Sequence, residues 1–302
     1  MENKKKFATN RDIILFLLPA LILFIGVLIA PIVMSTYYSF FDWNGFGKKT
    51  FIGIENYQEL FSSKAIGFVK ALGNSLLLAA LSVFIQLPLS LGLALLLGKK
   101  IRGERVFLSV YFMPVLISTV VIGQLWLKMY NPSYGIINMA FKNTALYAKI
   151  TGALGTENIM WLGDIKLALG ACFVPTLWQY VGYHMLLMYA GVKSVPIEYR
   201  EAAKLDGATE GQVNRYIVIP YIKNILKVSV IFAVTGSLKS FDLIYVLTNG
   251  GPLHSTEVPS TLMIDMLFLR NRYGMGSTIA VMLIILCFAF ALLISRVFKE
   301  DD

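Results

Sequence analysis

Polar side chains interrupt several long apolar stretches of the chain, and their types suit hydrogen bonding to an uncharged solute. Amides and hydroxyls can bond the hydroxyl groups of such a solute, and aromatic rings can stack on its apolar faces. The alternative is hydrogen bonding between helices, which explains most polar residues in apolar helices. The candidates for a solute pathway, densest between positions 178 and 183, are Asn74, Gln86, Gln124, Trp178, Gln179, Tyr180, Tyr183, Ser237, Lys239 and Asp242.

Lys239 and Asp242 are the main charged residues beside these apolar stretches. Their spacing lets them pair on one face of a helix, which lowers the cost of holding charge at that depth. On one interpretation they line the mouth of a cavity, and on the other they lie solvated among lipid headgroups. The apolar stretches hold no carboxylate relay of the kind that a proton- or sodium-coupled carrier usually needs.

The sequence offers no catalytic or metal-binding constellation. His184 and His254 have no carboxylate or cysteine partners at metal-ligand spacing, and Cys172 and Cys287 both fall in apolar stretches. There is no phosphate-binding G-x-x-x-x-G-K-S/T motif, so the chain cannot hydrolyse ATP by that route. We therefore expect no catalytic residue, no metal and no cofactor in this chain.

The composition implies that membrane-spanning helices position these residues. The 302 residues are 57% hydrophobic and only 15% charged, which predicts an all-α polytopic membrane protein. All the apolar runs but the fifth have about 20 residues or more, enough to cross a hydrocarbon core of ~30 Å. A retained first span is favoured over a signal peptide, because the first run is long and lacks a clear cleavage site. The six predicted transmembrane helices are 13–35, 72–97, 106–127, 167–189, 228–238 and 274–294.

The distribution of basic residues predicts the orientation of these helices. Four connecting segments hold 16 of the 27 lysines and arginines, although together they are much shorter than the other three. Basic residues gather on the cytoplasmic side, which also explains the net charge of +9 without invoking nucleic acid. Both termini are thus expected in the cytoplasm. The four basic segments are the N-terminal tail 1–12, the turn 98–105, the loop 190–227 and the C-terminal tail 295–302.

A polar, helix-forming segment at 196–220 lies between apolar runs on this cytoplasmic side. Asp206-Gly207 is expected to end a first helix, because glycine tolerates the left-handed geometry of a C-terminal cap. Thr209 and Gln212 have the capping-box spacing and predict the start of a second helix. Small alanines on the first helix leave a shallow surface against which a partner can press, so we interpret the segment as a docking element.

The same segment resembles a known family. Glu201-Ala202-Ala203, followed by Gly207, Ile217 and Pro220, reproduces the EAA loop of binding-protein-dependent ABC importer permeases. The longer run Asp206-Gly207-Ala208 resembles the carbohydrate branch, which contains the maltose and multiple-sugar permeases. The resemblance implies a type I ABC importer transmembrane domain over 72–294, with a coupling loop at 193–220. The residues that it assigns to contact with an ATPase are Glu201, Ala202, Ala203, Asp206 and Gly207.

The resemblance also implies the partners of the chain. They are a second, similar permease, two copies of a cytoplasmic ATPase that holds ATP and Mg²⁺, and an extracytoplasmic sugar-binding protein. The expected location is a bacterial plasma membrane, with lipid around the spans. Gly250, Gly251 and Pro252 would shape an outer loop that touches this receptor, although a generic turn is the alternative.

The functional hypothesis is therefore a permease subunit that forms half of the translocation pathway of an ATP-driven sugar or oligosaccharide importer. A stand-alone secondary carrier or channel for a small polar solute is the rival hypothesis. Such a carrier would move solute when it is alone in liposomes, whereas an importer subunit would be inert there. The sequence does not identify the sugar.

Overall fold

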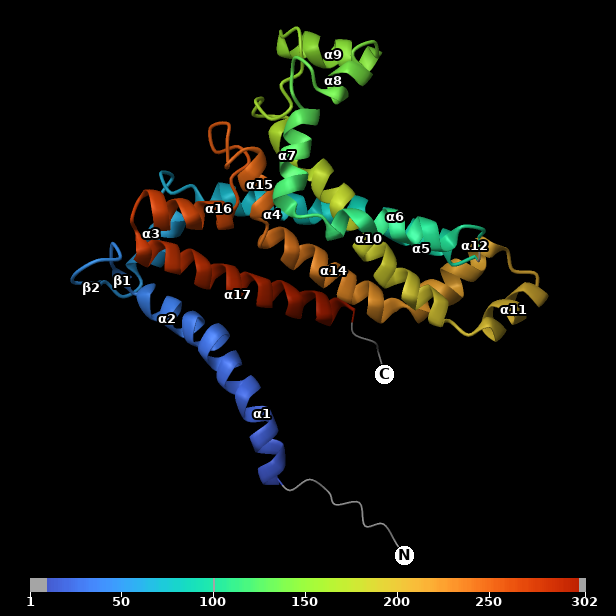
Figure 1. Ribbon diagram of the computed structural model, residues 1–302, viewed down its shortest axis with the longest axis horizontal. Helices are drawn as coiled ribbons and strands as arrows, with labels where there is room; N and C mark the ends of the chain where they lie inside the picture. The colour runs from blue at the N-terminus through green and yellow to red at the C-terminus, as the bar shows by residue number, and fades with distance from the viewer. Residues whose placement is uncertain (1–9, 100, 299–302) are drawn as a thin grey trace, which may run out of the picture. The chain divides into compact units, whose positions relative to one another are not determined.

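The computed structural model describes residues 10–99 and 101–298 (Figure 1). The predicted tails 1–12 and 295–302 lie largely outside these residues. The elements in chain order are α1 (Asn10–Phe24), η1 (Ile25–Ile29), α2 (Ala30–Tyr38), β1 (Phe41–Asp42), β2 (Thr50–Phe51), α3 (Glu55–Ser62), α4 (Phe68–Leu81), η2 (Ser82–Gln86), α5 (Leu87–Leu97), α6 (Glu104–Leu116), α7 (Thr119–Met129), α8 (Ile136–Phe141), α9 (Ala145–Leu154), α10 (Ala168–Ser194), α11 (Ile197–Leu205), α12 (Glu210–Val213), η3 (Asn214–Val218), α13 (Ile219–Tyr221), α14 (Lys223–Leu238), α15 (Asp242–Leu247), α16 (Pro259–Ile264), η4 (Asp265–Leu269) and α17 (Tyr273–Val297).

Four helical segments in the described chain are long and apolar enough to cross a membrane: Ile14–Tyr38, Phe68–Leu97, Lys223–Leu247 and Tyr273–Val297. They correspond to the predicted first, second, fifth and sixth spans, and the fifth is longer than predicted. The predicted fourth span corresponds to α10, whose 27 residues are sufficient in length. Polar side chains keep α10 less apolar than the other four, so the count of six spans stays a prediction.

The predicted third span, 106–127, is wrong as one straight helix. It is a pair, α6 and α7, bent by 95° at a short break. Ile117 and Ser118 have extended ψ values of 137° and 131°, which separate the two helices. Pro114 lies in the last turn of α6, where it has no N–H to donate to the turn before it. The sequence pattern was continuous in hydropathy across this break, so hydropathy alone could not locate it.

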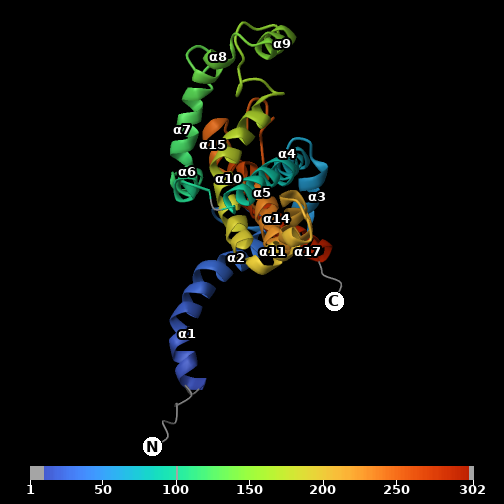
Figure 2. The same cartoon turned by 90° about the vertical axis from the view of Figure 1, so that its right-hand side faces the viewer.

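The chain divides into two compact units, of which the larger comprises 64–262 and 283–298 of the described residues. Helix α10 runs through this unit and packs most extensively against α5 and α6 (Figures 1 and 2). One apolar cluster joins α7, α15 and the N-terminal part of α10, and it includes Trp126 and Ile244. A second joins α5, the C-terminal part of α10 and residues 213–222, and it includes Met185 and Val218.

The smaller unit comprises 10–63 and 263–282 of the described residues. Strands β1 and β2 form a short antiparallel hairpin, and the Asn56 side chain donates to the carbonyl oxygens of Ser39 and Phe41 at 2.9 and 3.0 Å. Arg272, just before α17, pairs with Glu59 of α3 through two hydrogen bonds. The apolar helix Ile14–Tyr38 buries none of its most apolar window, as suits a segment surrounded by lipid.

The polar segment 196–220 folds as two helices, as predicted. Helix α11 ends at Asp206, and Gly207 follows with φ of 82°. Thr209 and Gln212 form the predicted capping box at the start of α12. Pro196 is the N-cap of α11.

Candidate functional site

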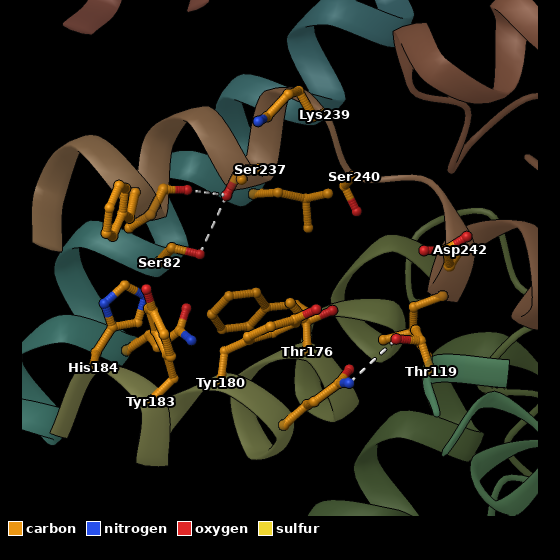
Figure 3. A pocket seen from close by; sticks show the side chains of 18 of the residues that line it. Ser82, Thr119, Thr176, Tyr180, Tyr183, His184, Ser237, Lys239, Ser240 and Asp242 are labelled. Carbon is orange, nitrogen blue, oxygen red and sulfur yellow. Dashed lines mark hydrogen bonds between the residues drawn. The ribbon is translucent and has the colours of Figure 1, made fainter. Parts of the chain in front are cut away.

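A cavity of about 350 Å³ lies within the larger unit, where two helices are interrupted (Figure 3). On one side α6 gives way to α7, and on the other α14 ends at Leu238 before α15 begins at Asp242. Val115 and Thr119 flank the first break and line the cavity, as do Ser240 and Phe241 at the second. Helix breaks free backbone groups from the helical ladder, so the cavity lies where the chain can present hydrogen-bonding groups in an apolar surrounding.

One face of α10 forms a polar and aromatic wall of the cavity. Its lining residues recur at intervals of three or four, which places them on one side of the helix. They are Phe173, Thr176, Gln179, Tyr180, Tyr183 and His184. In Figure 3 the labelled members of this wall project toward Ser82 and Ser237 on the opposite side. A single helix face therefore supplies amide, hydroxyl, imidazole and aromatic groups together.

Two of these side chains hold polar atoms that are buried and unpartnered among the described residues. Gln179 is 2% exposed, and its Oε1 has no hydrogen-bond partner, whereas its Nε2 donates to Thr119 Oγ1 at 3.3 Å. His184 is 4% exposed, and its Nδ1 has no partner. Buried polar atoms are normally satisfied, and an unsatisfied one carries a desolvation cost. The wall therefore holds unsatisfied hydrogen-bonding groups next to the cavity.

The opposite wall comes from η2 and α14. Ser82 Oγ and Ser237 Oγ lie 3.4 Å apart, and the Ser237 hydroxyl also donates to the Ala233 carbonyl oxygen at 2.8 Å. Gln86, 2% exposed, adds an amide to the lining. Phe232 and Phe241 supply apolar rings. Hydroxyls and rings thus occur on both sides of the space.

Lys239 and Asp242 both line the cavity, but the prediction that they share one helix face is wrong. Lys239 is the C-cap of α14, and Asp242 begins α15 after the break. Both side chains are exposed, and no ion pair joins them in the described chain. Phe241, with φ of −141° and ψ of −70°, is the residue that leaves the helical geometry.

The structure brings seven of the ten predicted pathway residues to the cavity: Gln86, Gln179, Tyr180, Tyr183, Ser237, Lys239 and Asp242. The other three lie elsewhere. Gln124 is exposed on α7, and Trp178 packs edge-to-face on Trp126 at 6.2 Å between ring centroids. Asn74 donates to two loop carbonyls far along the chain.

Several lining residues were not predicted from the sequence. They are Ser82, Thr119, Thr176, His184, Phe232 and Ser240. The helical period along α10 could have found Thr176 and His184, because they share a face with Gln179 and Tyr180. Thr119 and Ser240 could not be found in that way, because they line the cavity only through the two helix breaks.

The docking hairpin presents a second candidate surface. Glu201, Ala202, Asp206 and Gly207 are exposed on it, and Ala203 is half-buried against the α5–α10 cluster. Leu205 of α11 is 89% exposed. The surface that a partner could cover therefore includes a large apolar side chain.

Hydrogen bonds and ion pairs fix this hairpin to the rest of the unit. Arg200 of α11 donates through Nη2 to the Val192 carbonyl oxygen near the end of α10. Lys204 Nζ lies 2.5 Å from Glu210 Oε1, which joins α11 to α12. The hydrogen bond from Lys204 lowers the pKa of Glu210 below its usual value, so the carboxylate stays charged near neutral pH.

The three predicted receptor-contact residues lie in a tight loop after α15. Gly250 is buried, and Gly251 and Pro252 are half-buried. The exposed tip is formed by the next two residues, Leu253 and His254. A search of the described residues finds no cluster of histidine, cysteine and carboxylate side chains able to hold a metal ion.

Comparison with known proteins gives consistent matches over most of the chain. The profile of the family described as "Binding-protein-dependent transport system inner membrane component" matches residues 86–299. A probable ABC transporter permease protein of Pyrococcus horikoshii is 38% identical over 282 residues, which cover 93% of each chain. A xylose/arabinose import permease protein of Haloferax volcanii is 34% identical over 251 residues, covering 82% of this chain and 75% of the relative.

The fold also matches a solved structure. A chain of a bacterial ABC transporter involved in the import of the acidic polysaccharide alginate superposes with a TM-score of 0.79. The match covers 95% of this chain and 96% of that one at 22% sequence identity. At this identity the match establishes the common fold and does not indicate which solute this chain carries.

Proposed function

The chain belongs to the family of binding-protein-dependent transport system inner membrane components, and from this premise we propose that it is the permease subunit of an ATP-driven sugar or oligosaccharide importer. As a member of this family with several apolar helices, it is an integral membrane protein. In this family the ATPase is a separate chain, so the permease is not itself the enzyme.

The observation that supports this solute class is the chemistry of the cavity. Its lining combines hydroxyls, amides and aromatic rings, and its only charges are Lys239 and Asp242 at one end. The hydroxyls of a sugar can bond the polar side chains of this lining, and its apolar ring faces can stack on Tyr180 or Tyr183. The xylose/arabinose import relative fits the same solute class.

We further propose that the hairpin couples ATP hydrolysis to movement of the cavity wall. Helix α11 is bonded to the end of α10 through Arg200, and α10 carries six residues of the cavity wall. A force on α11 is thus transmitted to α10, the helix whose side chains would contact the solute. ATP binding can shift the permease between inward- and outward-open states only if the ATPase contacts the two states differently.

The proposed complex has the partners that the resemblance implies. A second permease would form the other half of the pathway, two ATPases would engage the docking hairpins, and a receptor would deliver solute from outside. Both termini and the hairpin would face the cytoplasm, in keeping with the basic connecting segments.

Reconstitution separates this proposal from the stand-alone carrier. The purified chain is placed in liposomes alone, or with the permease, ATPase and receptor that copurify with it. Uptake is measured with a panel of labelled pentoses, disaccharides and oligosaccharides. We expect uptake only from the complete complex with ATP. Solute movement by the chain alone would overturn the proposal in favour of a carrier or channel.

A further inference from the structure

Two residues of α4 hold the outer loop 249–257. Asn74 Nδ2 donates to the carbonyl oxygens of Ser255 and Glu257, at 2.9 and 2.8 Å. Lys70, one turn earlier on the same helix face, donates through Nζ to the carbonyl oxygen of Leu253 at 3.3 Å. Carbonyl groups of alternate loop residues therefore all point to one stripe of α4. We call Lys70 and Asn74 the α4 clasp.

The loop is also bonded within itself. Thr256 Oγ1 lies 2.7 Å from Thr248 Oγ1 and donates to the Gly251 carbonyl oxygen at 2.8 Å. The Thr256 amide donates to the Gly250 carbonyl oxygen at 3.2 Å. His254 Nδ1 lies 2.9 Å from Glu257 Oε2. Together with the clasp, these contacts define one loop conformation.

The conformation that they hold is one the chain would not adopt readily. Leu253 and His254 have φ values of 47° and 55°, in the left-handed region that residues with a side chain rarely occupy. Such strained residues persist only where the surroundings fix them. At the tip of the loop, Leu253 is 78% exposed and the His254 side chain is 64% exposed.

We propose that Asn74, supported by Lys70, is a positioning residue that presents the Leu253–His254 tip to the extracytoplasmic solute receptor. This inference rests on the proposed function, because the importer must recognise a receptor. A loop that is already ordered loses less conformational entropy when it is bound, so the clasp strengthens receptor binding without touching the receptor. Both amide hydrogens of Asn74 are used in the clasp, which leaves it outside the solute cavity.

The test compares Asn74→Leu with two other variants on α4. Leucine has a similar size but no donor, so it removes both hydrogen bonds. Lys70→Met removes the weaker contact at an exposed position and avoids the question of misfolding. Ser75→Ala is the matched control, because Ser75 is buried on α4 and its hydroxyl has no partner among the described residues.

ATPase activity of the reconstituted complex is titrated with the solute-binding protein that copurifies with the wild-type complex and is identified by mass spectrometry. We expect Asn74→Leu to raise the half-saturating concentration about tenfold, equivalent to about 1.4 kcal/mol, with an unchanged maximal rate. Lys70→Met should raise it less, and Ser75→Ala should leave it unchanged. A lower maximal rate at unchanged half-saturation would overturn the proposal and assign Asn74 to the solute pathway.

Hydrogen exchange of residues 249–257 tests the clasp without any receptor. Asn74→Leu should speed exchange in this loop while Ser75→Ala does not, and equal exchange in the two variants would overturn the proposal. If the wild-type complex is not stimulated by any solute-binding protein, the proposed function fails. Hydrogen exchange still decides whether Asn74 orders the loop, so the two failures are distinguishable.

Discussion

Gln179 and Gln124 carry the same amide in apolar surroundings, but they face different environments. Gln179 is buried in the cavity wall with one oxygen unpartnered, and Gln124 is exposed on α7. An interaction with solute requires an amide that lines the pathway. The two residues therefore form a matched pair for testing the proposed cavity.

We expect Gln179→Leu to reduce solute uptake at least about tenfold, because a lost hydrogen bond that leaves a buried solute hydroxyl unpaired costs ~1–3 kcal/mol. Gln124→Leu should leave uptake within about twofold of the wild type. Both variants are measured by initial uptake rates in proteoliposomes, with subunit assembly checked by copurification. Equal effects of the two substitutions would remove the cavity as the site of solute contact.

Leu205 is the residue of the docking hairpin whose exposure calls for an explanation. The proposed coupling places the ATPase over α11, so we expect the ATPase to cover Leu205, which is 89% exposed. Leu205→Glu should weaken binding of the ATPase by about 2 kcal/mol, as expected for a residue at the centre of an interface. The stability of the permease should change little, because the side chain is exposed. The measurement is recovery of the ATPase with tagged permease. Full recovery would mean that the ATPase binds another surface of the hairpin.

At the scale of elements, the contact between α10 and α6 depends on a single glycine. A Cβ at Gly182 would overlap the Tyr111 carbonyl group of α6, whereas one at Gly170 of the same helix would meet nothing within 4 Å. Helices can approach this closely only where a small residue lies between their backbones. Gly182 thus brings the cavity wall of α10 against the bent α6–α7 pair.

Gly182→Ala should lower the free energy of unfolding by about 1–3 kcal/mol, since the backbone of α6 must shift to make room. Gly170→Ala should be neutral or stabilising by up to about 1 kcal/mol, because alanine favours the helix. Thermal unfolding of the two purified variants in detergent checks this difference. An equal melting temperature for both would refute the close-packing argument.

The ion pair between α3 and the residue before α17 gives a prediction about pH. Hydrogen bonds from Arg272 lower the pKa of Glu59 below its usual value of 4.5. The pair therefore stabilises the fold fully above about pH 4.5 and loses this effect as the pH falls through the lowered pKa. Because the Glu59 side chain is 41% exposed, its contribution is at most about 1 kcal/mol.

Glu59→Gln should accordingly reduce the melting temperature at pH 7, and the difference from the wild type should shrink below about pH 4.5. Melting curves of both proteins in detergent across this range measure the effect. Glu55→Gln on the same helix is the control, because Glu55 makes no ion pair in the described chain. A difference that grows on acidification would contradict the assigned direction of the pKa shift.

These elements also mark how far the sequence predicts the structure. Long apolar runs predicted the second and sixth spans to within a few residues, because burial in lipid depends on hydropathy and length. Cap residues predicted the bend at Gly207 and the start at Thr209, because capping is local. The end of α14 at Leu238 agrees with the predicted end of the fifth span. The break at Ser118 and the helix that begins at Asp242 were not predicted, because they depend on packing between distant segments rather than on local composition.

The sequence likewise predicted some residues of the candidate site and missed others. Residue types predicted most of the cavity wall on α10, where a helical period converts spacing into a face. Asn74 was assigned to the pathway for the same reason, yet its partners lie more than 180 residues away in sequence. A single side chain carries no information about such a long-range partner, so only the folded chain distinguishes a solute contact from a clasp.

At the scale of the whole molecule, the proposed function requires the docking hairpin and the α8–α9 segment to face opposite sides of the membrane. In both ribbon views α8 and α9 lie beyond the far end of α7, away from α11 (Figures 1 and 2). Only a cytoplasmic hairpin can reach an ATPase, and only an outer loop can reach an extracytoplasmic receptor. The orientation of the spans is therefore a condition for both contacts.

Labelling with a membrane-impermeant maleimide tests this orientation. Single cysteines replace the exposed residues Lys149 of α9 and Glu198 of α11, after Cys172 and Cys287 are changed to alanine. Lys149→Cys should react in intact cells, whereas Glu198→Cys should react only after the membrane is permeabilised. The basic residues favour this arrangement, because they gather in the segments that include the hairpin. The reverse labelling pattern would place the hairpin outside, where no ATPase could engage it, and coupling through α11 would then be impossible.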